Sequence, residues 1–258
     1  MQNPGHNQQP YKEWVARASR ENSTRIILAI DIDTGPPDSG LEHARGLLEK
    51  THPYLCAVKL SRQTILNLGT TRTARLVKQI HQHNLPSIID DKLNDIGETN
   101  RAIAQAYFSL GLDALIANPF AGWKGGLQPL FQTAHGSSRG VILLAYMSHP
   151  GADESYGQLV VTGRSRKLRP QYLLFADKAL KWRADGVVVG ATRPQILKEV
   201  KSVLGKKIPV YSPGVGAQGG DLRKAKEVGT DYFIIGRSIS RAPRPGEAAA
   251  RFANLSRE

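Results

Sequence analysis

Eight short apolar runs recur along the chain, and each is followed by a segment long enough to form a helix. Strands whose two faces are both covered form such nearly continuous runs, whereas a strand with one wet face alternates apolar and polar residues. The runs are RIILAID (25–31), LCAVKL (55–60), PSIID (86–90), DALIAN (113–118), GVILLAY (140–146), DGVVVG (185–190), IPVYS (208–212) and DYFIIG (231–236). Eight strand–helix repeats fit a closed parallel barrel better than an open doubly wound sheet. The pattern therefore predicts an α/β protein with a single (β/α)8 TIM barrel.

Two of the intervening segments show helical spacing together with a helix end. In SGLEHARGLLEK (39–50), apolar side chains recur every three to four residues, and Ser39 is the expected N-cap. The segment TRPQILKEVKSVLG (192–205) closes with a glycine, which is a common helix stop. Both segments are expected to be helices that connect successive barrel strands.

An extra helix is expected before the first strand. Four apolar or aromatic residues recur there at i, i+3, i+4 and i+7, namely Tyr11, Trp14, Val15 and Ala18. Such a helix would cover the bottom of the barrel. We therefore divide the chain into a polar N-terminal extension with a short helix (1–24) and a barrel catalytic domain (25–258), and we expect the first ten residues to be disordered.

Length and composition agree with one soluble globular domain. The 258 residues match the roughly 250 of a single barrel. No apolar stretch approaches the ~18 residues that a membrane-spanning helix needs. Cys56 is the only cysteine, so no intrachain disulfide can form, and its apolar neighbours predict a core position. Because the N-terminal segment lacks the basic start and apolar centre of a signal peptide, we expect a cytoplasmic protein.

The chain is strongly basic, because 35 Lys and Arg oppose 22 Asp and Glu for a net charge of +13. A field of that sign attracts nucleic acid or small anionic substrates, and charge alone does not choose between them. The excess is densest in GRSRKLRP (163–170), which we interpret as a solvated loop. Zinc-finger spacing and aromatic ribonucleoprotein motifs are both missing from the sequence.

Charged residues stand at the ends of three neighbouring strands, where a barrel carries its chemistry. Asp31 closes the first strand, Lys59 lies near the end of the second, and Asp90 and Lys92 follow the third. An isolated Asp-x-Lys is usually a surface ion pair of little energetic value. Two lysines and two or three carboxylates that converge on one mouth instead predict a functional site with perturbed proton affinities.

The segment SIIDDKLNDIGETN (87–100) holds three aspartates around one lysine. Side chains alternate faces along a strand, so Asp90 and Lys92 are expected to point into the mouth and Asp91 away from it. Asp91 is then a structural residue that bonds an adjacent helix. Asp95 lies beyond the strand, so alternation does not place it.

Two glycine-rich segments follow the seventh and eighth strands. SPGVGAQGGD (212–221) carries Gly214, Gly216, Gly219 and Gly220, and IIGRSI (234–239) carries Gly236 and Arg237. Backbone amides next to glycine approach an anion closely, and arginine offers a planar fork to phosphate. Since the loops after these strands often hold a phosphate in this fold, we predict a phosphorylated substrate. Metal catalysis is less favoured, because the histidines are scattered and only His149, beside Ser148, lies near a strand end.

Together these motifs resemble the orotidine 5′-monophosphate decarboxylase family, particularly its archaeal type, over about residues 25–255. The markers are LAID (28–31), VK (58–59), DDKLNDI (90–96) with ETN (98–100), MSHPGA (147–152), SPGVGAQGGD and IIGRSI. The resemblance implies a cofactor-free and metal-free conversion of orotidine 5′-monophosphate to uridine 5′-monophosphate in de novo pyrimidine biosynthesis.

The resemblance also implies roles for individual residues. The catalytic residues would be Lys59, Asp90, Lys92 and Asp95, with Lys92 protonating C6 of the pyrimidine. Substrate-binding residues would be Asp31, Lys59, Ile96, Thr99, Ser148, Pro213, Gly214, Gly216, Gln218, Gly219, Gly236 and Arg237. Of these, Asp31, Lys59 and Thr99 would contact the ribose, Ser148 the pyrimidine, and Gln218, Gly236 and Arg237 the phosphate. A homodimer would share its sites, with Asp95 and Thr99 supplied by the neighbouring subunit.

Two alternatives remain. A magnesium-dependent sugar-phosphate decarboxylase or aldolase of the same suprafamily shares the Asp-x-Lys-x-x-Asp signature, and loss of activity with a chelator would favour it. A noncatalytic nucleic-acid-binding barrel is motivated only by the net charge, and such a protein would have no need of the Lys–Asp network. Neither a membrane nor a specific nucleic acid is expected as a partner.

Overall fold

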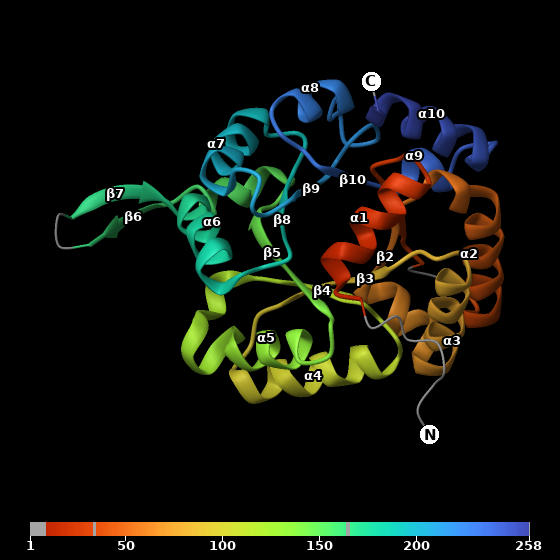
Figure 1. The fold of residues 1–258 in the computed structure, drawn as a ribbon, viewed down its shortest axis with the longest axis horizontal. Helices are drawn as coiled ribbons and strands as arrows, with labels where there is room; N and C mark the ends of the chain where they lie inside the picture. Colours follow the sequence, from red (N-terminus) through yellow and green to blue (C-terminus); the bar gives the residue numbers. More distant parts are fainter. Residues whose placement is uncertain (1–8, 33–34, 164–165, 258) are drawn as a thin grey trace.

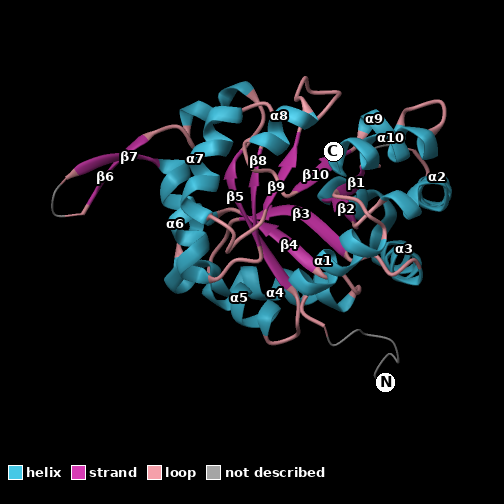
Figure 2. Cartoon of the chain, turned by 45° about the horizontal axis from the view of Figure 1, so that its top comes forward, coloured by secondary structure: helices cyan, strands magenta, loops and turns pink. Residues whose placement is uncertain are grey.

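The structure is a computed structural model that describes residues 9–32, 35–163 and 166–257. Parallel strands close into a barrel in the order β1-β2-β3-β4-β5-β8-β9-β10, with helices around it (Figures 1 and 2). The barrel strands are β1 (Ile26–Ile30), β2 (Ala57–Ser61), β3 (Ser87–Leu93), β4 (Ala114–Ala117), β5 (Gly140–Tyr146), β8 (Gly186–Val189), β9 (Val210–Pro213) and β10 (Tyr232–Ile235). Each lies in one of the eight apolar runs or overlaps it, so the predicted (β/α)8 barrel is confirmed.

Helices connect these strands on the outside of the barrel. The α-helices are α1 (Tyr11–Glu21), α2 (Pro37–Thr51), α3 (Arg62–Gln82), α4 (Gly97–Ser109), α5 (Gln128–His135), α6 (Gln171–Trp182), α7 (Pro194–Leu204), α8 (Leu222–Glu227), α9 (Arg237–Ser240) and α10 (Pro245–Arg257). Short turns of other helix types are η1 (His52–Tyr54), η2 (Pro119–Ala121), η3 (Trp123–Leu127) and η4 (Pro150–Glu154). Within the described ranges, no helix is both long and apolar enough to cross a membrane.

Helix α1 crosses one end of the barrel, as Figure 1 shows. Its four predicted contact residues are all buried, which confirms the expected cover helix. The Tyr11 hydroxyl donates to the Tyr211 hydroxyl of β9 at 3.3 Å, and Trp14 Nε1 donates to the Asn84 carbonyl before β3 at 3.0 Å. Gly140 is required at this contact, because a Cβ there would lie 2.4 Å from the Tyr11 ring. The division of the chain at residue 24 stays a prediction, and residues 1–8 lie outside the described part.

Of the two predicted helix ends, one is confirmed and one is wrong. Helix α7 ends at Leu204, and Gly205 follows with a φ of +56° that favours glycine. Helix α2 begins at Pro37 with Pro36 as its N-cap, so Ser39 lies inside the helix rather than capping it. The fixed φ of proline suits the first helical position, and the helix therefore starts earlier than the serine signal suggested.

The prediction that the basic segment 163–170 is a solvated loop is wrong for its second half, which forms a strand. Strand β6 (Leu159–Thr162) pairs antiparallel with β7 (Lys167–Pro170), and the ribbon projects from the barrel beside α6 (Figure 1). Exposed and partly buried residues alternate along β6, and Leu168 of β7 stands between the basic Lys167 and Arg169, a spacing of two that is typical of a hairpin. Residues 164 and 165 lie outside the described part.

Candidate active site

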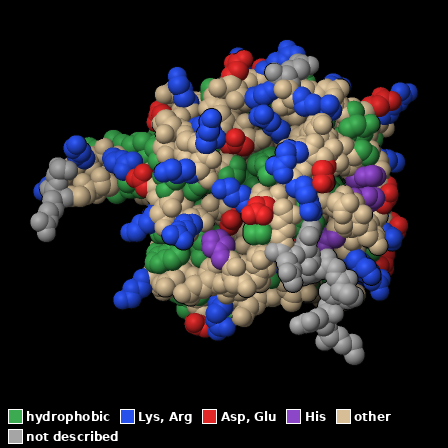
Figure 3. Space-filling view, viewed as in Figure 1, with side chains coloured by type: hydrophobic (Ala, Val, Ile, Leu, Met, Phe, Trp, Pro, Cys, Tyr) green, Lys and Arg blue, Asp and Glu red, His purple; other side chains and the backbone are tan. Residues whose placement is uncertain are grey.

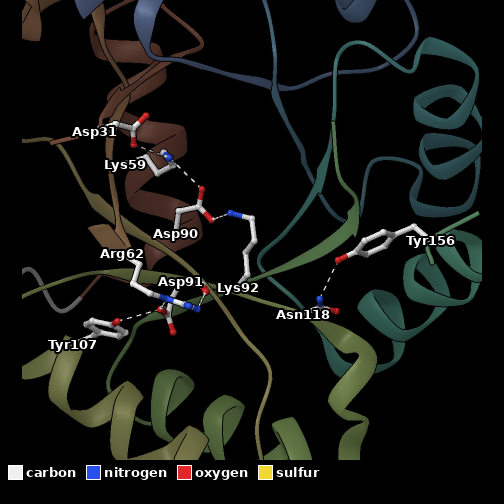
Figure 4. A network of polar contacts seen from close by, with 9 residues as sticks. All are labelled: Asp31, Lys59, Arg62, Asp90, Asp91, Lys92, Tyr107, Asn118 and Tyr156. Carbon is white, nitrogen blue, oxygen red and sulfur yellow. Dashed lines mark hydrogen bonds and ion pairs between the residues drawn. The ribbon is translucent and has the colours of Figure 1, made fainter. Parts of the chain in front are cut away.

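Four charged side chains from three adjacent strands form a chain of alternating sign at the barrel mouth, drawn in Figure 4. Lys59 Nζ lies 3.5 Å from Asp31 Oδ1 and donates to Asp90 Oδ2 at 3.1 Å. Lys92 Nζ donates to the other oxygen of Asp90, Oδ1, at 2.6 Å. Asp90 therefore bridges two ammonium groups, and Lys59 bridges two carboxylates. The structure therefore brings together the four charged residues that the sequence predicted to lie at the barrel mouth.

Burial and the neighbouring opposite charges shift the pKa values of Lys59 and Asp90 in opposite directions. The Lys59 side chain is only 8% exposed, and burial alone would lower its pKa. The carboxylates of Asp90 and Asp31 outweigh that effect and raise the pKa above its usual value. Burial likewise pushes the pKa of Asp90 upward, but Lys59 and Lys92 hold it below its usual value. Lys59 and Asp90 are therefore both charged at neutral pH.

The backbone at Lys92 departs from a regular strand. Its φ is +54°, in the left-handed region, and the pairing of β3 with β4 shifts register between Ile89 and Leu93. A non-glycine residue in this region costs about 1–3 kcal/mol and persists only where its surroundings hold it. Alternation along a regular strand predicted that Lys92 and Asp90 both point into the mouth. In the structure, the direction of the Lys92 side chain is set by this irregularity of the strand next to the mouth.

Asp91 points away from the mouth and anchors two helices, which confirms its predicted structural role. Its carboxylate accepts from Arg62 Nε of α3, and Arg62 Nη2 donates to its backbone carbonyl. Tyr107 of α4 donates its hydroxyl to Asp91 Oδ1 at 3.2 Å. Burial, followed by the charge of Asp91, raises the pKa of Tyr107 to about 12. The sequence indicated a helix partner but identified neither Arg62 nor Tyr107.

Asp95 lies in the loop before α4 and makes no ion pair with the charged chain at the mouth. Its Oδ1 accepts from the Ile96 amide at 2.7 Å, and the buried Asn100 side chain donates to its carbonyl at 2.6 Å. No ion pair joins Asp95 to a lysine anywhere in the described ranges. Ile96 is 68% exposed, which is unusual for so large an apolar side chain, and Thr99 is partly exposed. The acidic Asp95 and the apolar Ile96 are thus both exposed on a loop that the buried Asn100 holds by hydrogen bonds.

The glycine-rich loop after β9 folds back on itself. Gly214, Gly216 and Gly219 have φ values of +95°, +76° and +84°, which other residues rarely adopt. The Gly219 amide donates to the Gly216 carbonyl at 2.7 Å, and the Gly220 amide donates to the Gly214 carbonyl at 3.0 Å. Such a turn lets backbone amides approach an anion without obstruction by side chains. Pro213 ends β9, and Gln218 lies at the tip of the turn beside Gly214.

The loops after β9 and β10 are joined directly. Ser238 of α9 accepts a hydrogen bond from the Ala217 amide at 2.9 Å. Gly236 caps α9, and a Cβ there would lie 3.6 Å from Asp31 Oδ2, so the phosphate-binding candidates adjoin the charged chain. Arg237 is exposed, and no ion pair engages its guanidinium in the part of the chain that the structure describes. An incoming anion could therefore bind it without displacing a partner.

Ser148 lies after β5 and packs against Gly190 at the end of β8. A Cβ on Gly190 would come within 2.9 Å of the Ser148 Cβ, so only glycine permits this approach. Farther along the segment, the Tyr146 hydroxyl bonds Asp153, and Arg193 Nη2 lies 3.3 Å from the same carboxylate. These contacts tie the Ser148 segment to the neighbouring strand end.

A second tie crosses to β4. Asn118 Nδ2 donates to the Tyr156 hydroxyl at 3.0 Å, beside the charged chain in Figure 4. Tyr156 is buried, and its ring packs edge-on against Phe120 and Phe175. Sequence reasoning missed both residues of this bond. Asn118 could have been found, because it is the polar residue that ends the fourth apolar run.

The described residues hold one cluster of three potential metal ligands, and it lies away from the mouth, on α2, on η1 and directly after α3. At the mouth, both Asp31 and Asp90 already contact lysine. The mouth is thus suited to an anionic substrate that meets ammonium groups at one end and backbone amides at the other.

Comparison with known proteins agrees with this geometry. The model of the orotidine 5′-phosphate decarboxylase / HUMPS family matches residues 24–252. The Methanosarcina mazei orotidine 5′-phosphate decarboxylase is 33% identical over 233 residues, which cover 90% of this chain and 95% of that protein. The crystal structure of orotidine 5′-monophosphate decarboxylase from Methanocaldococcus jannaschii, complexed with inhibitor BMP, aligns with a TM-score of 0.76 and 28% identity over 91% of this chain and 99% of that chain.

A Toxoplasma gondii structure aligns with a higher TM-score, 0.84, at 21% identity over 96% of this chain and 94% of that chain, and at that identity it shows the fold alone. The family match covers nearly the whole barrel, and the archaeal relative is similar over almost its full length. The resemblance read from the motifs is thereby confirmed, and this chain belongs to the orotidine 5′-phosphate decarboxylase / HUMPS family.

Proposed function

We propose that this protein decarboxylates orotidine 5′-monophosphate to uridine 5′-monophosphate, the reaction that completes this nucleotide in de novo pyrimidine biosynthesis. The observation that carries the proposal is the Asp31–Lys59–Asp90–Lys92 chain at the mouth, next to a glycine-rich loop suited to phosphate. The similarity to a decarboxylase along almost its full length supports it.

The substrate would lie between these two regions. Amides of the loop after β9, which contains Gly214, Gly216 and Gly219, bind the phosphate together with Gln218, Gly236 and the exposed Arg237. Asp31 and Lys59 hold the ribose hydroxyls, and Ser148 bonds the pyrimidine from the opposite side of the mouth. Pro213 and Ile96 border the substrate. In this pose the carboxylate of the base lies near Asp90 and Lys92.

Lys92 supplies the central chemical step. The bond between C6 and the carboxyl carbon breaks, carbon dioxide leaves, and the electron pair stays on C6. No neighbouring group can delocalise that pair, so an ammonium fixed beside C6 stabilises the charge as it develops. Lys92 then donates a proton to C6 and recovers one from solvent. The sequence of steps requires no cofactor.

Asp90 positions the proton donor. It accepts from Lys92 at 2.6 Å while Lys59 holds its other oxygen at 3.1 Å, so the Lys92 ammonium has a fixed place before substrate arrives. Binding energy from the distant phosphate contributes to the rate if it is used to orient the base against this fixed group.

We further propose a homodimer whose sites are shared. Asp95 does not contact the charged chain of its own subunit, and the exposed Ile96 beside it is suited to burial against another subunit. In a twofold-symmetric dimer, the loop of each subunit that carries Asp95 reaches the site of the other subunit, so each site gains Asp95 and Thr99 from the partner. This arrangement adds a fourth member to the catalytic set of Lys59, Asp90 and Lys92.

A decarboxylation assay tests the activity. Release of carbon dioxide from carboxyl-labelled orotidine 5′-monophosphate should be unaffected by a chelator, and the inhibitor BMP should compete with the substrate. The Lys92→Ala variant should be folded and inactive. Loss of activity with chelator and its recovery on adding magnesium would favour the sugar-phosphate alternative. An absence of carbon dioxide release from the folded wild-type protein would refute the proposal.

A further inference from the structure

A cluster of metal-ligating side chains lies at the end of the barrel opposite the charged mouth. Glu49 is in the last turn of α2, His52 opens η1 directly after it, and His83 is the C-cap of α3. One ligand atom from each of the three residues lies within 4.8 Å of the others. Figure 3 shows histidine and acidic side chains side by side over this region, near the right-hand edge.

The carboxylate of the cluster is held in place by its neighbours. Gln79 Nε2 donates to Glu49 Oε1 at 2.7 Å, and Arg45 Nε in turn donates to Gln79 Oε1 at 2.9 Å. His83 Nε2 lies 3.1 Å from the same oxygen of Glu49. A carboxylate has a second oxygen with which to bind an ion, so this network orients Glu49 without using all of its capacity. Side chains that orient a ligand in this way accompany most metal sites in proteins.

The two imidazoles are already adjacent. The rings of His52 and His83 stack with their centroids 3.9 Å apart and their planes 20° from parallel. The His83 side chain is 18% exposed and that of Glu49 is 54% exposed, so an ion can reach the cluster from solvent. Both α2 and α3 end here, and the partial negative charge at helix C-termini favours a cation.

We propose that Glu49, His52 and His83 form a binding site for a divalent transition-metal ion of the zinc type, with water completing its coordination. Two imidazoles and one carboxylate are a ligand set that zinc accepts, whereas magnesium and calcium prefer oxygen ligands alone. Zinc–ligand distances of about 2.0–2.2 Å require the three groups to move together by roughly 1 Å. Rotation of the partly exposed side chains allows this, and the His83–Glu49 contact is replaced by two bonds to the ion.

The ion would link the C-terminal ends of two neighbouring helices. Helices α2 and α3 already share the Arg45–Gln79–Glu49 network, and a metal bond to His83 would extend that link to the end of α3. The net charge of +13 opposes any cation, but distant charges are screened beyond about 10 Å at moderate salt. Binding therefore depends on direct ligation, and it is independent of the proposed decarboxylation.

Calorimetric titration of the untagged full chain with zinc chloride, after treatment with a chelator, tests the proposal. We expect saturable binding of one ion per chain and a melting temperature that rises with zinc concentration. His83→Ala and Glu49→Gln should each weaken binding at least about tenfold, and Gln79→Ala should weaken it about tenfold by releasing Glu49.

His43→Ala is the matched control, because His43 is exposed on α2 and outside the cluster. This variant should bind zinc as the wild type does, and so should His149→Ala at the mouth. Saturable binding that survives in both His83→Ala and Glu49→Gln, or no binding by the folded wild type at 100-fold excess zinc, would overturn the proposal. Carbon dioxide release measured on the same samples reports on the proposed activity separately.

Discussion

Asp90 and Asp91 are adjacent in sequence, but their replacement by asparagine should affect different properties. Asp91→Asn should lower the stability of the fold, and Asp90→Asn should lower the turnover number. Asp91 is 5% exposed and accepts from Arg62 and Tyr107, on the face of β3 that points away from the mouth. Hydrogen bonds to charged groups contribute about 1.5–3 kcal/mol, but the Arg62 side chain is 55% exposed, and solvent screening reduces its share to about 1 kcal/mol or less. The Tyr107 bond adds about 1 kcal/mol. Asparagine keeps one accepting oxygen, so Asp91→Asn should lose about 1–2 kcal/mol of folding free energy.

For a chain of this size that loss lowers the melting temperature by about 2–8 °C. The turnover number of folded Asp91→Asn at 25 °C should stay within about threefold of wild type, because Lys92 and Asp90 keep their contacts. Asp90→Asn removes the carboxylate that fixes Lys92, and removal of one preorganised electrostatic group costs about 100-fold or more in turnover. Thermal melts and initial-rate assays on the two variants measure both quantities. An Asp91→Asn protein that melts as the wild type does but no longer turns over would refute this division of roles.

Three further predictions follow from the same site. Arg237→Ala should lower kcat/KM for the phosphorylated substrate about 10- to 100-fold, because about 1.5–3 kcal/mol of binding energy is lost. The same variant should leave the reaction of the unphosphorylated nucleoside unchanged. Equal effects on both substrates would contradict the assignment of Arg237 to the phosphate. Lys92→Ala and Asp95→Ala dimers should each be inactive, but after subunit exchange the mixture should recover about a quarter of wild-type activity, since about half the dimers are mixed and each carries one intact site. No recovery despite demonstrated exchange would exclude a shared site. The lowered pKa of Asp90 means that its charge stabilises the fold above its ordinary pKa of 3.8 and that this contribution is lost as pH falls through the lowered value. The stability difference between wild type and Asp90→Asn should therefore be constant from pH 7 to about 5 and shrink below 3.8 in acid titrations by chemical denaturation; a difference that shrinks near neutral pH would contradict it.

The barrel could be predicted because its strands are covered on both faces. Strand β5 is buried along its whole length, and so is β1, which leaves the nearly continuous apolar signal that the sequence displays. The β6–β7 hairpin was missed for the opposite reason. It projects from the barrel, and its apolar residues Leu159, Val161 and Leu168 are exposed, so it lacks the buried run by which the other strands were recognised.

The candidate site could be predicted only in part. Alternation assigned Asp90 and Asp91 to opposite faces, because the strand is regular up to that point. It had no means to foresee the left-handed backbone at Lys92 or the register shift beside it, since both depend on how β3 meets β4. Partners such as Tyr107 for Asp91, or Tyr156 for Asn118, lie 16 and 38 residues away along the chain, and the packing of the folded elements brings them together.

The charged chain at the mouth is better explained by preorganisation than by stability. Removing Lys59 and Asp90 from water costs several kcal/mol per ion, and the attraction between them often does no more than offset that cost. The left-handed backbone at Lys92 adds about 1–3 kcal/mol of strain. A sequence selected for stability alone would replace this arrangement with apolar residues. What the arrangement supplies is an ammonium group whose position is fixed by Asp90, itself held from the other side by Lys59, so that no reorganisation is needed when negative charge develops beside it.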